Sequence, residues 1–168
     1  EAAEMAKLAE TTYRDVNIGL ANQFGRFAAG NGIDIYKVID ACNSQPFSHI
    51  HRPGIAVGGH CIPVYPRLYL WTDPDATIVR TAREANMQMP DYTVSLAESA
   101  LDGSLAGRRV VVLGASYRGR VKETAFSGVF TAVDALKARG AEVLVERDGD
   151  EDSGGDLDEL LVLELPEH

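Results

Sequence analysis

Basic residues, cysteines and long apolar runs are all scarce in this chain of 168 residues. It has 16 Lys and Arg against 25 Asp and Glu, for a formal net charge of -9, so we do not expect the clustered positive charge that nucleic acid requires. No apolar run approaches the roughly 20 residues of a membrane-spanning helix. The first residues do not resemble a signal peptide. We therefore expect a globular cytoplasmic protein that binds neither nucleic acid nor a membrane.

Two cysteines are too few for a disulfide framework, and we expect both to be free thiols. Cys42 falls on the apolar face of a predicted helix, which favours a place in the core. Cys61 lies in "GIAVGGHCIPVYP" (54–66), where glycine and proline exclude a regular element. A thiol on such a loop is either buried and inert, or reactive because a nearby cation raises its thiolate fraction. Lys7 is a candidate for that cation.

A metal centre would have to use the histidines near Cys61. Zinc sites need paired ligands at short, regular spacing, and His49, His51, His60 and Cys61 do not have it. The sequence therefore predicts no metal site.

The first 101 residues have a helical pattern. Apolar residues recur at helical spacing from 1 to about 30, and a second helix is expected over 34–43 with Asp34 as its N-cap. The long helix starts without a cap, so we expect the chain to begin inside a larger protein. A loop follows over 44–66, and then a helix from 75 to about 101 that Pro90 bends or restarts.

The pattern changes after the polar stretch 102–107. "RRVVVLGA" predicts a buried strand, 130–140 a helix and 141–146 a second strand, which together make one βαβ unit. The final segment, 148–168, carries nine acids and no Lys or Arg, and "DELLVLEL" within it is a candidate for one more element. The patterns predict a mostly α domain (1–101), a truncated α/β domain (107–147) and an acidic tail (148–168).

The turn "LGASYRG" after the first strand invites a dinucleotide-binding interpretation. The full fingerprint needs three glycines, and only Gly114 and Gly119 are present, so the pattern is weak. Arg118 and Arg120 beside a helix N-terminus are compatible with a phosphorylated ligand, and a plain scaffold turn remains open.

Four segments, taken together, resemble the UDP-glucose/GDP-mannose dehydrogenase family, in particular its UDP-N-acetylhexosamine branch. They are "AEMAKLAETTYRDVNIGLAN", "GIAVGGHCIPV", "AREANMQMP" and "VVVLGASYRG", in the family's order and spacing, and the resemblance extends over about 1–147. It implies three parts: an NAD-binding domain, a helical domain that forms a homodimer, and a Rossmann-like domain that helps bind the UDP-sugar. This chain resembles the second part and the opening of the third. The resemblance therefore implies a mostly α central dimerisation domain over 1–101 and a truncated α/β Rossmann-like domain over 107–147, with NAD bound mainly by a domain that the chain lacks.

The resemblance also implies a reaction and the residues that perform it. The reaction is a two-step oxidation of a sugar C6 alcohol to a carboxylate with two NAD, on UDP-N-acetylmannosamine or UDP-N-acetylglucosamine. Cys61 would add to the aldehyde, and Lys7 would stabilise the oxyanion and assist proton transfer. The substrate-binding residues implied in the same way are Arg14, Gly58, Tyr117 and Arg118.

Four positions depart from the family pattern. Thr11 stands in place of an asparagine, Phe47 and Ala125 in place of arginines, and Tyr65 in place of an aspartate. The alternative function is therefore a non-catalytic dimerisation or nucleotide-sugar-binding module.

Overall fold

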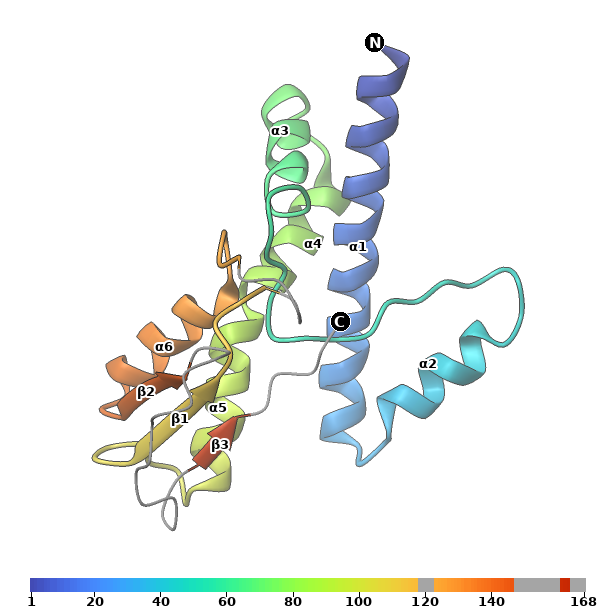
Figure 1. The fold of residues 1–168 in the computed structure, drawn as a ribbon. Coiled ribbons are helices and arrows are strands. Elements are labelled where there is room, and N and C mark those ends of the chain that lie inside the picture. The colour runs from blue at the N-terminus through green and yellow to red at the C-terminus, as the bar shows by residue number, and fades with distance from the viewer. Residues whose placement is uncertain (118–122, 147–160, 164–168) are drawn as a thin grey trace.

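A computed structural model describes residues 1–117, 123–146 and 161–163 (Figure 1). The described helices are α1 (Ala2–Gly30), α2 (Ile35–Asn43), α3 (Tyr65–Thr72), α4 (Thr77–Met87), α5 (Met89–Ala100) and α6 (Gly128–Ala138). The strands are β1 (Arg109–Leu113), β2 (Glu142–Glu146) and β3 (Leu161–Leu163). The prediction of a mostly helical protein with a small parallel sheet is confirmed, and among these residues no helix is long and apolar enough to cross a membrane.

Local sequence signals explain where most of the helices begin and end. The Asp34 side chain accepts hydrogen bonds from the backbone N–H groups of Tyr36 and Lys37 at 3.0 and 3.3 Å, which confirms the predicted N-cap of α2. Pro90 lies in the first turn of α5, where a helix needs no N–H donor, and Gln88 separates α5 from α4. Ile39 is the buried residue of α2, whereas Cys42 is only half-buried, so its predicted place in the core is wrong.

The sheet is parallel in the order β2-β1-β3. Val110 pairs with Val143 of β2, and Val111 pairs with Val162 of β3, which confirms one further element within the "DELLVLEL" segment. Val110 and Val112 pack into one apolar core with residues of both α5 and α6, including Val94 and Leu136. This βαβ arrangement matches the predicted unit, and its assignment as a Rossmann-like domain stays a prediction.

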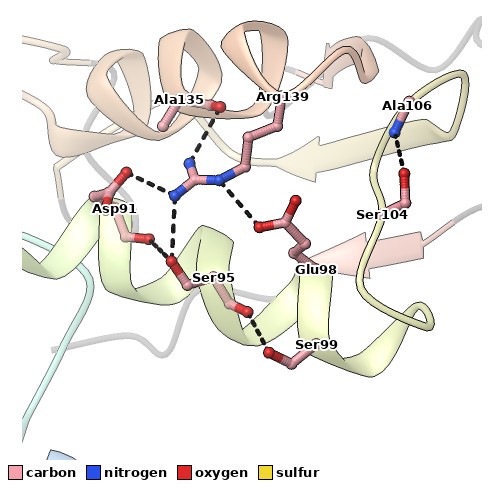
Figure 2. A network of polar contacts seen from close by, with 8 residues as sticks. All are labelled: Asp91, Ser95, Glu98, Ser99, Ser104, Ala106, Ala135 and Arg139. Carbon is pink, nitrogen blue, oxygen red and sulfur yellow. Dashed lines mark hydrogen bonds and ion pairs between the residues drawn. The ribbon is translucent and has the colours of Figure 1, made fainter.

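Arg139, at the C-terminal end of α6, joins that helix to α5 (Figure 2). Its guanidinium contacts Asp91 at 2.9 Å, Ser95 at 3.2 Å and Glu98 at 3.3 Å, all on α5. A guanidinium can satisfy several acceptors at once because its donors are fixed in a plane. The α5–α6 pair therefore has a polar edge in addition to the apolar core.

The long helix α1 buries a face that its hydrophobic pattern did not predict. Its buried residues are small or polar, namely Thr11, Thr12, Asp15, Gly19, Ala21, Asn22 and Ala28. A Cβ at Gly19 would lie 2.9 Å from the carbonyl oxygen of Ala82 on α4, so glycine permits the close approach of the two helices. The apolar residues Met5, Tyr13, Leu20, Phe24 and Phe27 of the same helix are exposed.

A buried polar network lies between α1 and α4. The Arg83 Nη1 and Asp15 Oδ1 atoms form an ion pair at 2.9 Å, and the Asn86 amide donates to the Asp15 carboxylate at 2.8 Å. The ion pair is close but poorly aligned, since Asp15 Oδ2 and the Arg83 Nε and Nη1 atoms make no hydrogen bond to the described residues. Burial raises the pKa of Asp15 above its ordinary value and lowers that of Arg83. Each charge is therefore tolerated mainly because the other is present.

We expect Arg83→Met to destabilise the fold by about 3–5 kcal/mol at neutral pH, because it leaves the Asp15 carboxylate buried without its cation. Adding Asp15→Asn should recover part of this loss, since the uncompensated charge is then gone. Arg80→Leu changes an exposed arginine of α4 whose one hydrogen bond to the described residues is to the Pro74 carbonyl, and it should cost no more than about 1.5 kcal/mol. The measurement is urea unfolding.

The loss in Arg83→Met should also depend on pH. A carboxyl group with a raised pKa binds its proton more tightly in the folded state, so its contribution to stability is present in acid and is lost as pH rises through that pKa. The loss should therefore shrink as the pH is lowered. Equal losses for Arg83→Met and Arg80→Leu, independent of pH, would show that the ion pair has no such role.

Candidate functional site

The loop that carries Cys61 is held to α1 at two points. It follows α2 and runs across α1 before α3 begins (Figure 1). Asn17 donates to the His49 carbonyl at 2.6 Å and accepts from the His51 N–H at 2.9 Å. Asn22 accepts from the Gly54 N–H at 2.9 Å and donates to Asn86, so it joins the loop to the buried network. Two side-chain amides of one rigid helix thus fix the path of the loop before the cysteine.

Cys61 lies in the turn that leads directly into α3. Its carbonyl accepts hydrogen bonds from the N–H groups of Val64 at 3.1 Å and Tyr65 at 3.0 Å. The predicted loop extended to residue 66, but α3 begins at Tyr65, so the cysteine is closer to regular structure than expected. The thiol is half-buried and makes no disulfide. A position of this kind keeps the backbone fixed while leaving the residue partly accessible.

Lys7 reaches this turn from the first part of α1. Its ammonium nitrogen lies 5.7 Å from the centre of the Tyr65 ring and 3.7 Å from a carboxylate oxygen of Glu10. Thr11 is buried and its hydroxyl donates to the Lys7 carbonyl at 2.7 Å, so Thr11 contacts the backbone of Lys7 and not its ammonium group. The structure therefore brings Lys7 close to the Cys61 turn through Tyr65.

Arg14 extends the charged face of α1 beyond Lys7. Its guanidinium contacts Glu10 at 3.4 Å, and its side chain is about half exposed. Glu10 thus lies between the two cations, each of which is partly open to solvent. A second anion approaching Lys7 and Arg14 would compete with this one carboxylate.

Gly58 and Tyr117 come together just before the cysteine. A Cβ at Gly58 would lie only 2.4 Å from the Tyr117 Cβ, and Gly59, with φ of +89°, lies against the Tyr117 ring. The Gly59 N–H donates to the Ala125 carbonyl at 2.9 Å. The glycines of "GGHC" are therefore needed for the loop to pack on the segment that follows β1.

His60 and Glu123 form a contact across the same boundary. The His60 Nε2 and Glu123 Oε2 atoms are 3.4 Å apart, and both side chains are largely exposed. The Ala125 N–H, and then the His60 side chain, lower the pKa of Glu123.

Other predicted residues lie apart from these contacts or outside the described residues. Arg118 and Arg120 fall in 118–122, which the structure does not describe. Phe47 is 92% exposed on the loop after α2. Within the described ranges, no group of three or more His, Cys, Asp or Glu side chains is placed to hold a metal ion.

The described part of the turn after β1 differs from the dinucleotide fingerprint. Gly114 has φ of +82°, and the next helix among the described residues begins at Gly128. In the dinucleotide fingerprint the helix begins within the glycine turn itself, so that its N-terminal N–H groups meet the phosphates. The described part of this turn instead joins Gly114 to Glu146 and Tyr117 to Glu123 through backbone hydrogen bonds.

Residues that sequence reasoning missed are those that hold the loop in place. Asn22, Asn86 and Glu123 were not singled out, and Tyr65 was noted only as a departure from the family pattern. A polar residue on a helix usually marks a solvated face, and nothing in its own identity distinguishes a buried amide from an exposed one. Together the geometry supplies a half-buried cysteine, an ammonium group over the Tyr65 ring and a charged helix face, which is a set suited to covalent chemistry on an anionic substrate.

Comparison with known proteins gives a consistent result. Residues 1–88 match the model of the central domain of the UDP-glucose/GDP-mannose dehydrogenase family. A UDP-N-acetyl-D-mannosamine dehydrogenase of Methanocaldococcus jannaschii is 38% identical over 143 residues, which is 85% of this chain and 33% of that protein. Another, of Pyrococcus horikoshii, is 39% identical over 145 residues, or 84% of this chain and 35% of that protein.

Solved structures agree with these relatives. The UDP-D-ManNAc dehydrogenase of Pyrococcus horikoshii has a TM-score of 0.79 at 37% identity, covering 86% of this chain and 35% of the other. A UDP-glucose dehydrogenase of Pyrobaculum islandicum has a TM-score of 0.82 at 28% identity, covering 97% and 39%. The chain spans about a third of the length of the curated relatives it matches. Because the family model matches more than half of it, the chain belongs to the UDP-glucose/GDP-mannose dehydrogenase family.

Proposed function

We propose that this chain is the substrate-binding and dimerising portion of an NAD-dependent UDP-N-acetylhexosamine 6-dehydrogenase. The observation that supports this most directly is the contact of Lys7 with the Tyr65 ring, because the backbone N–H of Tyr65 in turn donates to the Cys61 carbonyl. The names of the relatives favour UDP-N-acetylmannosamine as the substrate. On this proposal the helical part (1–101) and the α/β part (107–147) are separate domains, and the enzyme is cytoplasmic.

Cys61 is the proposed nucleophile. Its thiolate adds to the C6 aldehyde carbon, so that a carbon–sulfur bond forms and the carbonyl π electrons move to oxygen. Loss of hydride converts this adduct to a thioester, and water then releases the carboxylate and the free thiol. NAD, held by a part of the enzyme outside this chain, would supply the hydride acceptor in both oxidations.

Lys7 is the proposed stabiliser of the developing oxyanion. An ammonium group beside the Cys61 turn offsets the negative charge on the adduct oxygen and can hold or deliver its proton. Its ion pair with Glu10 at 3.7 Å holds the group on the charged face of α1. Thr11 is given no part in this step, because its hydroxyl donates to the backbone carbonyl of Lys7.

Four residues are proposed to bind the nucleotide sugar. Arg14 suits a diphosphate, since a guanidinium forms charge-assisted hydrogen bonds to phosphate oxygens. Gly58 lets the loop backbone approach its partners closely, and Tyr117 packs against that loop. Arg118 follows Tyr117 in sequence and completes the proposed set.

A homodimer is proposed because α1 exposes an apolar stripe of Met5, Tyr13, Leu20, Phe24 and Phe27. Monomeric proteins rarely leave so many large apolar side chains contiguous and open to water. Burying this stripe against a second copy of α1 would remove it from solvent. A two-fold interface of this type brings the same patch of both subunits together.

We expect Phe27→Glu to weaken self-association by about tenfold or more, because it places an unpaired charge in the buried stripe. Phe130→Glu makes the same change at an exposed phenylalanine of α6, away from the stripe, and should leave association unchanged. Sedimentation equilibrium measures both. A wild-type chain that sediments as a monomer at all concentrations would show that the dimer proposal is wrong.

We expect the intact polypeptide, with an NAD-binding domain in front of this chain, to reduce two NAD per sugar. Cys61→Ser should stop at or before the aldehyde, because an alcohol oxygen is a far weaker nucleophile than a thiolate at neutral pH. Cys42→Ser, the matched change at the other half-buried cysteine, should still form the acid. The products are separated chromatographically.

Acid formation by Cys61→Ser at the wild-type rate would contradict the assignment of the nucleophile. If the intact wild-type protein binds UDP-sugars but oxidises none, the alternative of a nucleotide-sugar-binding module holds instead. Calorimetric titration with a panel of UDP-sugars tells these outcomes apart.

A further inference from the structure

The proposed mechanism gives no role to Tyr65, which directly follows the Cys61 turn. It nevertheless contacts the side chain of Lys7 and the backbone of Cys61. Its ring centre lies 5.7 Å from the Lys7 ammonium nitrogen, and its backbone N–H donates to the Cys61 carbonyl at 3.0 Å. It is also the first residue of α3, so its backbone is fixed by a helix.

The Lys7 side chain needs such a contact to stay near the cysteine turn. It is long and flexible, and it is 45% exposed. Glu10, one turn along α1 toward Arg14, competes for the ammonium group at 3.7 Å and would draw it along the helix. The electron-rich face of an aromatic ring attracts a cation from a different direction. Tyr65 supplies that ring from a separate element, α3.

We propose that Tyr65 is a positioning residue, which holds the Lys7 ammonium group over its ring while its backbone N–H holds the Cys61 carbonyl, so that the two groups are fixed relative to each other. The catalytic consequence of this inference rests on the proposed function. The contacts themselves are independent of that function. The ring is the important part of the side chain, because the contact is with its face. The hydroxyl group makes no hydrogen bond to the described residues through which it would hold Lys7.

The first test measures the geometry alone. In the 168-residue chain, an aromatic ring shifts the NMR signals of protons above its face upfield, so the Lys7 ε-methylene signal should lie upfield of those of Lys37 and Lys137. Neither of these lysines lies over a ring among the described residues. Tyr65→Phe should preserve the shift and Tyr65→Leu should abolish it. Tyr69→Leu, the matched change one turn further along α3, should preserve it.

A Lys7 signal without the upfield shift in the wild-type chain would overturn the proposal, and this result needs no variant to fold. An unchanged Lys7 signal in folded Tyr65→Leu would overturn it as well.

The second test measures the consequence for Cys61. Alkylation by iodoacetamide at neutral pH, followed by mass spectrometry of the Cys61 peptide, reports thiol reactivity without any substrate or cofactor. Tyr65→Leu should slow this reaction about two- to fivefold, the factor that corresponds to loss of a cation–π contact at a partly exposed site. Tyr65→Phe should react at the wild-type rate. If the tyrosine hydroxyl were the important group, Tyr65→Phe would be as slow as Tyr65→Leu.

A double-mutant comparison shows whether Tyr65 acts through Lys7. Lys7→Met should slow alkylation of Cys61, and adding Tyr65→Leu should then have no further effect, because the charge that the ring positions is already gone. Additive effects of the two changes would overturn the proposal. The proposed function is tested separately by acid formation, and it can fail while these contacts and rates are found as predicted.

Discussion

The buried chain of contacts that runs from Arg83 through Asp15, Asn86 and Asn22 to Gly54 is the constraint on which the rest of the structure depends. Burying an ion pair costs free energy, and burial shifts the pKa values of both partners toward their neutral forms. The network aligns α1 with α4 and attaches the cysteine loop to α1 at Gly54. Lys7 projects from the same helix, so one polar core sets the positions of both proposed catalytic residues.

Hydrophobic spacing and caps were enough to predict most of the elements. The Asp34 cap, the break before Pro90 and the apolar run of β1 each have a local physical cause that is visible in the sequence. The buried face of α1 was not predictable in the same way. Periodicity identifies an apolar face but not what covers it, and here the face inside the chain is small and polar while the apolar stripe is exposed. Cys42 was misplaced because α2 buries little beyond Ile39.

The residues of the candidate site were likewise predictable only in part. Cys61 and Lys7 were candidates from the residues alone, and the resemblance to a family implied their roles and added Arg14. The loop glycines could be interpreted because their backbone role is intrinsic to glycine. The asparagines that clamp the loop, and the ring of Tyr65 beneath Lys7, depend on contacts between residues far apart in sequence. Spacing along one helix gives no information about such contacts, so only the folded structure identifies these supporting residues.

Amide hydrogen exchange in Asn22→Leu tests most directly whether the network positions the cysteine loop. The account predicts that exchange over 54–61 becomes about tenfold faster, because the Gly54 N–H loses its acceptor and the loop loses its attachment to α1. Exchange in α6, which packs on α5 and β1, should remain as in the wild-type chain. Unchanged exchange over 54–61 in the folded variant would contradict the account.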